Sequence, residues 1–400
     1  MTGRTDRTAV VVGGGIGGFG AALALARTGT RVEVLEQAPE IKEIGAGLQL
    51  GPNATRILTQ LGVFDEVMRR AVVPTRFAIM DVYSGEELHH VRFGSDLEQR
   101  FGTPYIVLHR HDLLTALMEA ALATGLVTAH TAKTAVGVDQ DADSAWVECA
   151  DGSRHRADLV VGADGIRSSV RRAILDDSEP QTSEYVIYRG PGPRPEGVEN
   201  AVKLYTGDGM HLMQYPIAGG ELLNRVLSFK STAGEPGSDE WGTPEELHDR
   251  FAAACPYIRD SLSTLDLTKK WVQFDRPPLA GWTQGRVTLL GDAAHAMRQY
   301  LAQGAGQALE DGVGLAACLQ DHDDVATALA AYEATRYPRT SAVQMNTRFF
   351  GEFTHMGGLE AIVRNHLLAS LPNDNYDIAE WLYGDGSVPP PVPPAHLQLY

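Results

Sequence analysis

A run of glycines at residues 13–18 (GGGIGG) has the G-x-G-x-x-G spacing that binds the pyrophosphate of a dinucleotide. Gly13 permits a tight turn, Gly15 lets the backbone approach a phosphate, and Gly18 lets a helix pack closely on the preceding strand. Glu36 follows about 20 residues later, where its carboxylate can accept hydrogen bonds from ribose hydroxyls. The spacing therefore predicts a dinucleotide site, and it leaves NAD and FAD open as the ligand.

The segments around these glycines have the pattern of a strand, a helix and a second strand. Thr8–Val12 is a β-branched run typical of a buried parallel strand, and residues 19–27 are rich in Ala and Leu, as in a helix. Residues 31–35 form the second strand, which ends at Glu36. The glycine turn then lies at a helix N-terminus, where free N–H groups favour an anion. A glycine turn without a ligand is the alternative, and the three flanking features disfavour it.

Two further predicted strands end in an aspartate beside a glycine. Residues 158–161 lead into Asp164-Gly165, and residues 286–290 lead into Gly291-Asp292. A carboxylate at such a turn can accept hydrogen bonds from sugar or ribityl hydroxyls, while the glycine admits close backbone contact. The alternative for Asp292 is that it only caps the helix that follows.

Between residues 180 and 275 the pattern changes to alternating strands joined by hairpin-type turns, which predicts an antiparallel sheet. The predicted strands are 184–189, 201–205, 210–216 and 222–229. On the third strand, the period of two places His211, Met213 and Tyr215 on one face. An imidazole, a thioether and a phenol in one row suit an aromatic ligand. Ordinary core packing of these three side chains is the alternative.

Composition narrows the possible functions of the 400-residue chain. The net charge of −17 argues against nucleic acid and against a polybasic membrane anchor, and no apolar run approaches the length of a spanning helix. Three distant cysteines without a C-x-x-C pair suit a reducing cytosol, so we expect a cytoplasmic protein. The histidines at 89–90 and at 109 and 111 lack companions, so we expect no metal site.

The glycine fingerprint, ADG at 163–165 and GDAAH at 291–295 together make the chain similar to the single-component FAD-dependent aromatic hydroxylases. This group includes the para-hydroxybenzoate and salicylate hydroxylases, and the match extends from residue 8 to about 345. The resemblance implies an α/β fold: a Rossmann-like FAD-binding domain of the para-hydroxybenzoate hydroxylase type with an inserted antiparallel-sheet substrate domain and C-terminal helices. The expected parts are the first part of the FAD-binding domain (1–180), the substrate sheet (181–275), the return of the FAD-binding domain (276–345), and a C-terminal helix with a Pro-rich tail (346–400).

The resemblance also implies which residues bind FAD. They are Gly13, Gly15, Gly18, Glu36, Ala46, Gly47, Arg110, Asp164, Gly165, Asp292, Gly304 and Ala305. In the family, Glu36 would hold the adenosine ribose, Asp292 would meet the ribityl and pyrophosphate part, and Gly304 and Ala305 would offer backbone N–H groups to the isoalloxazine. No second fingerprint occurs, so the reduced nicotinamide is expected to bind only transiently, as NADH or NADPH with NADH favoured.

The activity implied is a monooxygenase reaction on an aromatic ring. Reduced nicotinamide delivers hydride to the flavin, and O2 adds at its C4a position to give a hydroperoxide that hydroxylates an electron-rich ring. His211 is expected to accept the phenol proton, Gln299 to hold the same oxygen or the hydroperoxide, and Tyr215 to orient a carboxylate or pack on the ring. As spaced here, these three resemble the substrate pocket of the gentisate-forming hydroxylases of 3-hydroxybenzoate. Most relatives carry proline at the position of Gln299.

Several alternatives stay open. The substrate could be salicylate or another phenol, and a flavoprotein dehydrogenase or oxidase without oxygen insertion is an alternative of another class. A flavin-binding module without activity is a third. The expected partner is a small aromatic substrate, and the chain is expected to be a monomer or a homodimer. His295 is interpreted as a residue that supports its loop, Arg298 has no assigned role, and residues 325–337 and 347–371 are predicted as helices.

Overall fold

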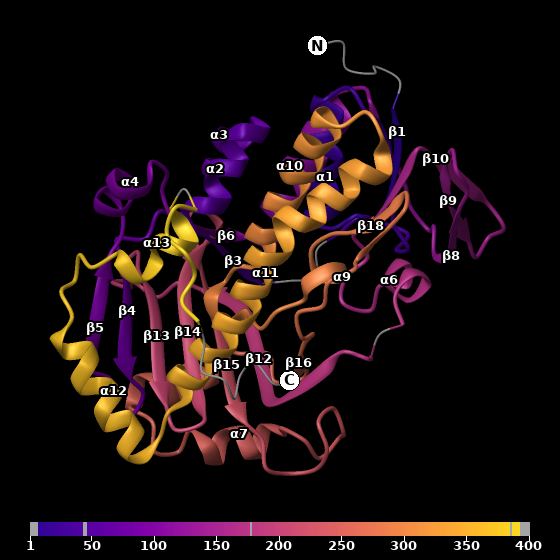
Figure 1. Cartoon of the computed structure of the whole chain (residues 1–400). Coiled ribbons are helices and arrows are strands. Elements are labelled where there is room, and N and C mark those ends of the chain that lie inside the picture. Colours follow the sequence, from indigo (N-terminus) through magenta and orange to yellow (C-terminus); the bar gives the residue numbers. More distant parts are fainter. Residues whose placement is uncertain (1–6, 43–45, 177, 385, 393–400) are drawn as a thin grey trace.

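A six-stranded, mostly parallel sheet forms the nucleotide-binding half of the molecule (Figure 1). The computed structural model describes residues 7–42, 46–176, 178–384 and 386–392. In order across the sheet, the strands are β17 (Thr283–Gln284), β18 (Val287–Leu289), β11 (Leu159–Gly162), β1 (Thr8–Val12), β2 (Arg31–Leu35) and β7 (Val127–His130). Only β17 pairs antiparallel with its neighbour among these strands.

The central strand β1 shows why the sheet is covered on both sides. Ala9 and Val11 belong to the apolar cluster that contains α1 (Ile16–Arg27), α5 (Arg110–Ala123) and α10 (Gly304–Asp321). Val10 and Val12 belong to a second cluster, formed with the small sheet β8 (Ala135–Gln140), β9 (Ala145–Cys149) and β10 (Arg154–Ala157). Successive side chains of a strand point to opposite faces, so the uninterrupted apolar run of β1 buries both.

A seven-stranded sheet forms the other half of the molecule. Its strands, in order, are β16 (Trp271–Asp275), β12 (Gln181–Pro193), β15 (Leu222–Lys230), β14 (Met210–Ile217), β13 (Val202–Gly207), β4 (Arg76–Asp81) and β5 (Glu87–Arg92). The four strands predicted from hairpin patterns are present. They pair antiparallel with one another, as expected, and the sheet is larger than expected, because β4 joins β13 in parallel and brings β5 with it from residues 76–92.

The C-terminal helices begin as predicted but divide at a different place. α11 (Val325–His355) runs without interruption through Pro338, where two separate helices were expected. Arg336 and Arg339, on either side of the proline, both bind buried carboxylates of α10, which holds the helix in place across it. The break comes instead at residues 356–357, before α12 (Gly358–Ser370), and α13 (Asp377–Tyr383) follows.

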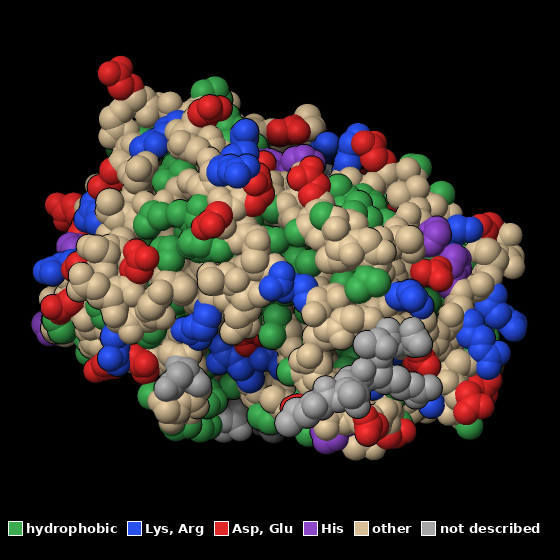
Figure 2. Space-filling view, turned by 90° about the horizontal axis from the view of Figure 1, so that it is seen from above, with side chains coloured by type: hydrophobic (Ala, Val, Ile, Leu, Met, Phe, Trp, Pro, Cys, Tyr) green, Lys and Arg blue, Asp and Glu red, His purple; other side chains and the backbone are tan. Residues whose placement is uncertain are grey.

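The remaining elements are short and connect these layers. They are β3 (Gly47–Leu50), α2 (Pro52–Leu61), α3 (Phe64–Met68), α4 (Ser95–Phe101), β6 (Ile106–His109), α6 (Ser169–Ile174), η1 (Ala218–Gly220), α7 (Pro244–Arg250), α8 (Pro256–Leu262), α9 (Asp292–His295) and η2 (Gln299–Leu301). No helix in the described part of the chain is both long and apolar enough to cross a membrane. Acidic and basic side chains are interspersed over the face shown in Figure 2. Of the Pro-rich tail, residues 393–400 lie outside the described residues.

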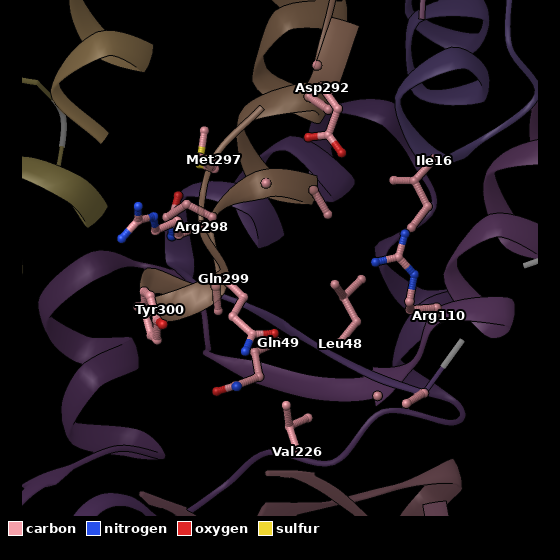
Figure 3. Close-up of a pocket in the computed structure, with 18 of the residues that line it drawn as sticks. Ile16, Leu48, Gln49, Arg110, Val226, Asp292, Met297, Arg298, Gln299 and Tyr300 are labelled. Carbon is pink, nitrogen blue, oxygen red and sulfur yellow. The ribbon is translucent and has the colours of Figure 1, made fainter. Parts of the chain in front are cut away.

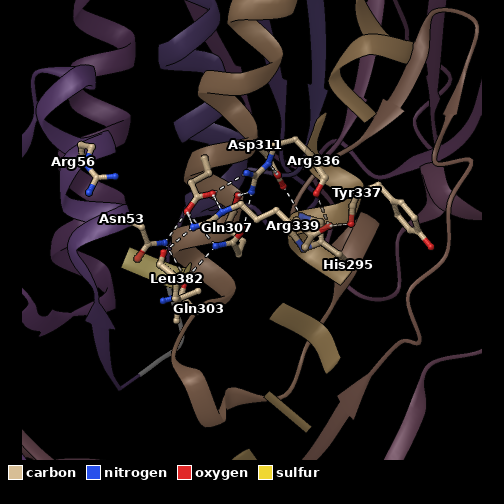
Figure 4. Close-up of polar contacts among 12 residues, drawn as sticks. Asn53, Arg56, His295, Gln303, Gln307, Asp311, Arg336, Tyr337, Arg339 and Leu382 are labelled. Atoms are coloured by element: carbon tan, nitrogen blue, oxygen red, sulfur yellow. Dashed lines mark hydrogen bonds and ion pairs between the residues drawn. The ribbon is translucent and has the colours of Figure 1, made fainter. Parts of the chain in front are cut away.

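Arg336 lies at the centre of a buried ionic cluster that joins α10 to α11 (Figure 4). Its Nε donates to Asp311 Oδ1 at 2.7 Å, its Nη1 to Glu310 Oε2 at 2.7 Å, and its Nη2 to Gln307 Oε1 at 2.8 Å. Glu310 also accepts from Asn53 Nδ2 of α2 at 2.7 Å. Burial would raise the pKa of Glu310, but Arg336 and the neighbouring Arg339 lower that pKa to about 2. Two carboxylates therefore stay ionised inside the protein.

The same cluster fixes the loop that begins with the GDAAH motif. Asp311 Oδ2 accepts from the Gly291 N–H at 3.0 Å and lies 2.6 Å from His295 Nε2. His295 and Arg336 keep the pKa of Asp311 well below its usual range, although burial alone would raise that pKa. This confirms the interpretation of His295 as a loop-supporting residue.

Replacing Arg336 with Met should lower the free energy of unfolding by roughly 3–5 kcal/mol, because two buried carboxylates would lose their counter-charge. Urea titration of the purified protein measures this change. Arg69→Met is the matched control, since Arg69 pairs with Glu66 on the surface, where its side chain is 71% exposed. That pair should contribute less than about 1 kcal/mol. Equal losses in the two variants would contradict a central role for Arg336.

Candidate functional site

A cavity of about 410 Å³ lies where the six-stranded and seven-stranded sheets meet (Figure 3). One part of its wall comes from the glycine turn before α1 and from the segment between β18 and α10. Another part comes from β14 and β15 of the larger sheet, and β3 and the start of α5 complete it. The cavity therefore joins the predicted nucleotide site to the predicted substrate sheet.

The three fingerprint glycines have different surroundings. A Cβ on Gly13, which has φ +108°, would clash with the Ala163 carbonyl, and one on Gly18 would clash with the Gly13 carbonyl. A Cβ on Gly15 would meet no protein atom within 4 Å, and Gly15 lines the cavity. Gly13 and Gly18 thus permit the close turn and helix contact, while Gly15 leaves open space beside the backbone. That difference matches the separate roles expected from the spacing.

Two predicted carboxylates lie outside the lining of the cavity. Asp164 faces the start of α6, where its Oδ2 accepts from Ser169 N at 2.7 Å and Ser169 Oγ at 2.9 Å, and Ser168 Oγ donates to its Oδ1. Its neighbour Gly165 does line the cavity. Glu36 accepts from the Gly14 N–H at 2.8 Å, directly behind the glycine turn. Both carboxylates therefore lie next to segments that line the cavity, without being part of its lining.

The remaining predicted cofactor residues come together along the cavity. Asp292, Gly304 and Ala305 line it from the GDAAH segment and the N-terminus of α10, and Arg110 lines it from the start of α5, with Ala46 and Gly47 completing this part. The N-cap of α9 is Gly291, with φ +60°, and no side chain caps that helix. Asp292 is the first residue inside α9, so the alternative that it serves only as a helix cap was wrong.

The row predicted on β14 is present. His211, Met213 and Tyr215 all line the cavity, and His211 and Tyr215 are each 3% exposed. Burial lowers the pKa of His211 to about 4, so its imidazole is neutral near pH 7. Burial raises the pKa of Tyr215, which keeps its hydroxyl protonated. The site thus offers a neutral imidazole that can accept a proton and a phenol that can donate one.

Gln299 approaches from the opposite side of the cavity. Its side chain points into the cavity toward Gln49 of β3 (Figure 3). Its Nε2 is buried and has no hydrogen-bond partner among the described residues. Because a buried amide N–H without a partner is costly, this group is suited to donate to a ligand. Gln299 and His211 thus offer one donor and one acceptor to a polar group in the cavity.

Two residues were not predicted from the sequence: Gln49, which lines the cavity, and His355, which lies next to it. His355, the last residue of α11, places its Nε2 2.8 Å from His211 Nδ1, and its ring stacks on Tyr185 with centroids 4.2 Å apart. Gln49 accepts from the Tyr105 hydroxyl at 2.8 Å. No local motif marks either residue. The alternation along residues 47–50 could have pointed to Gln49, whereas the position of His355 depends on the full length of α11.

Arg298 forms an ion pair with a buried aspartate. Its Nε donates to Asp275 Oδ2 at 3.1 Å, and Arg348 Nε donates to the same oxygen at 2.7 Å. Asp275, on β16, is only 2% exposed. Figure 3 shows the Arg298 side chain directed away from Gln299. The charge in this loop therefore joins the GDAAH segment to the edge of the larger sheet.

One group of side chains away from the cavity could hold a cation. Glu33 Oε2 lies 2.7 Å from His155 Nδ1 and 3.5 Å from His130 Nε2. The sequence pattern predicted no metal site and did not anticipate this grouping. A hydrogen bond between Glu33 and His155 accounts for the arrangement without an ion.

Comparison with known proteins agrees with this geometry. A family model described as an FAD binding domain matches residues 6–347. A 3-hydroxybenzoate 6-hydroxylase from Polaromonas naphthalenivorans (strain CJ2) is 40% identical over 385 residues, covering 95% of this chain and 96% of the relative.

Solved structures share the fold. HpxO of Klebsiella pneumoniae complexed with FAD and uric acid has a TM-score of 0.83 at 26% identity, covering 92% of this chain and 94% of that one. A salicylate hydroxylase substrate complex has a TM-score of 0.78, also at 26% identity, covering 95% of this chain and 96% of that one. These similarities show that the chain belongs to the FAD-binding family of flavin-dependent aromatic hydroxylases.

Proposed function

We propose that the chain hydroxylates a phenolic aromatic acid with NADH and O2, and that 3-hydroxybenzoate is the substrate and gentisate the product. The observation that carries this proposal is the pair formed by His211 and Gln299, a neutral buried imidazole and an amide N–H without a partner in one cavity. A phenol oxygen between them would give a proton to the first and accept a hydrogen bond from the second. The relative named for 3-hydroxybenzoate supports this choice of substrate.

The residues along the cavity fit FAD. The open space beside Gly15 and the N–H groups at the start of α10 suit a pyrophosphate and a ring that carries negative charge. We assign Arg110 and Asp292 to the same cofactor, since both line this part of the cavity. Asp164 would act through the loop that presents Gly165. Bound FAD supplies the activation of O2 with electrons taken from NADH.

His211 supplies the proton acceptor in this account. Because burial lowers the pKa of His211 to about 4, its ring is neutral near pH 7 and offers a lone pair to the proton of the substrate's hydroxyl group, but it is too weak a base to keep that proton. Loss of that proton places negative charge on the ring, which makes the ring a better nucleophile toward an electrophilic oxygen. Gln299 Nε2 would donate to the resulting phenolate oxygen and hold it in one position.

Tyr215 and the apolar wall complete the binding site. The Tyr215 hydroxyl, kept protonated by burial, would donate to the carboxylate of the substrate or pack its ring on the substrate's ring. The apolar side chains that line the cavity are Leu48, Leu204, Met213, Val226, Met297 and Phe350. They would exclude water from the reaction, so that electrons taken from NADH end in product rather than in peroxide.

The test of the proposed function compares three hydroxybenzoates. FAD-loaded enzyme is given NADH with 3-hydroxybenzoate, salicylate or 4-hydroxybenzoate, and products are identified by chromatography. We expect gentisate from 3-hydroxybenzoate, in proportion to the NADH consumed. Conversion of salicylate to catechol alone would give the salicylate hydroxylase alternative, and hydrogen peroxide with no hydroxylated product would give the oxidase alternative.

His211→Asn should slow product formation by about 10²–10⁴-fold, because asparagine cannot take the phenol proton. Gln299→Ala should lower the yield of product per NADH, because the phenolate would lose its donor. Both variants are assayed for NADH oxidation and for product. The control is His366→Asn, an exposed histidine of α12. Full coupled turnover in the His211 or Gln299 variant would contradict its assigned role.

Gly15→Ala and Gly18→Ala should fail in different ways. A methyl group at Gly15 meets no protein atom, so we expect a stable fold and FAD binding weakened at least tenfold, because the methyl takes the space assigned to the pyrophosphate. A methyl group at Gly18 meets the Gly13 carbonyl, so we expect loss of thermal stability before FAD is added. Quenching of flavin fluorescence and thermal melting separate the two effects. Unchanged FAD affinity in Gly15→Ala would place the pyrophosphate elsewhere.

A further inference from the structure

Two buried histidines that are far apart in the sequence form a direct contact behind the cavity. His211 lies on β14 and His355 ends α11, and His211 Nδ1 is 2.8 Å from His355 Nε2. The two residues are 3% and 7% exposed. A contact of this length between two ring nitrogens is a hydrogen bond, so one ring donates its proton and the other accepts.

The surroundings of His355 favour a neutral ring. Tyr185 of β12 stacks on it, and Tyr300 of η2 packs edge-on with centroids 5.4 Å apart. The charged groups that act on it are Arg298 and Arg364. Burial, together with His211 and these two guanidinium groups, holds the pKa of His355 well below its usual range. A proton on His355 is therefore held weakly.

We propose that His355 is a positioning and relay residue, which acts through His211 to carry the substrate's phenolic proton from the closed cavity to solvent. This inference rests on the proposed function, because it needs a phenol beside His211. His211 lines the cavity, whereas His355 does not. The His211 ring would therefore contact the substrate, and the His355 ring contacts His211 from outside the cavity lining.

The transfer balances without any change in oxidation state. The O–H bond of the phenol breaks as an N–H bond forms at His211 Nε2. The Nδ1–H bond of His211 breaks as an N–H bond forms at His355 Nε2. The proton on His355 Nδ1 then leaves to water. The products are a phenolate, two neutral imidazoles with exchanged tautomers, and one solvated proton.

The backbone of His355 lies beside an exposed turn. The carbonyl of His355 accepts from the Gly209 N–H at 3.0 Å, in the turn between β13 and β14. Asp208 of that turn is exposed, and its negative charge contributes to the raised pKa of Tyr185, whose ring stacks on His355. This exposed turn lies outside the cavity lining. In the proposed relay the proton leaves on this side, while the apolar wall keeps water away from the reacting ring.

The test measures proton release directly. FAD-loaded enzyme is mixed with 3-hydroxybenzoate in weak buffer with a pH-indicator dye, and hydroxylation is followed separately as a function of pH. In His355→Ala, both proton release and hydroxylation should slow by roughly 10–100-fold, with little change in KM. The loss should shrink as the pH rises, because hydroxide can then remove the proton. Added imidazole should restore the rate in His355→Ala but not in His355→Phe, whose ring fills the space.

Controls separate the relay from a structural role. His366→Ala, on the exposed face of α12, should behave as the wild-type enzyme. Each variant is first checked for flavin binding, and His355→Gln replaces His355→Ala if the latter does not bind FAD. Normal proton release and turnover in the His355 variants would overturn the relay alone. A slow variant that imidazole does not rescue, with proton release unchanged, would also overturn it. If the wild-type enzyme neither releases a proton nor hydroxylates any phenolic acid, the proposed function fails as well.

Discussion

The ion pairs of Arg336 with Asp311 and Glu310 join α10 to α11 and fix the GDAAH loop at the FAD end of the site. Asp311 fixes Gly291 and His295 of the GDAAH loop, and Glu310 reaches Asn53 of α2. Buried charges are costly to place in a protein, and here each carboxylate is paired with arginine and further hydrogen bonds. The buried charges lie beside the GDAAH loop, and part of that loop lines the FAD end of the cavity. The cluster thus makes one loop geometry much more favourable than the alternatives.

The chemistry of the substrate end also depends on burial. A histidine in water is partly protonated near neutral pH, whereas His211 is kept neutral because its ring is buried. The same shielding keeps the Tyr215 hydroxyl protonated. The neutral state of the His211 ring and the protonated state of the Tyr215 hydroxyl therefore both follow from the burial of β14. Neither pKa shift depends on a nearby carboxylate.

Much of this site could be predicted from sequence, because its signals are local. The glycine spacing indicated the positions at which a side chain would prevent a close backbone contact. The alternation along β14 placed His211, Met213 and Tyr215 on one face. Contacts between distant segments could not be predicted: α11 continues through Pro338, where two helices were expected, because Arg336 and Arg339 bind Glu310 on either side of the proline. The contact of His355 with His211 and the pairing of β4 with β13 also join segments that are distant in the sequence, so neither was predicted. Asp164 was recognised as part of a motif, but its hydrogen bonds to α6 were not foreseen.

The central claim is that this cavity directs an oxygen atom from O2 onto a phenolic ring. The most direct measurement uses isotopically labelled dioxygen with FAD-loaded enzyme, NADH and 3-hydroxybenzoate, followed by mass spectrometry of the product. The account predicts gentisate that carries one labelled oxygen atom. Label found only in hydrogen peroxide, or a product oxygen derived from water, would contradict it.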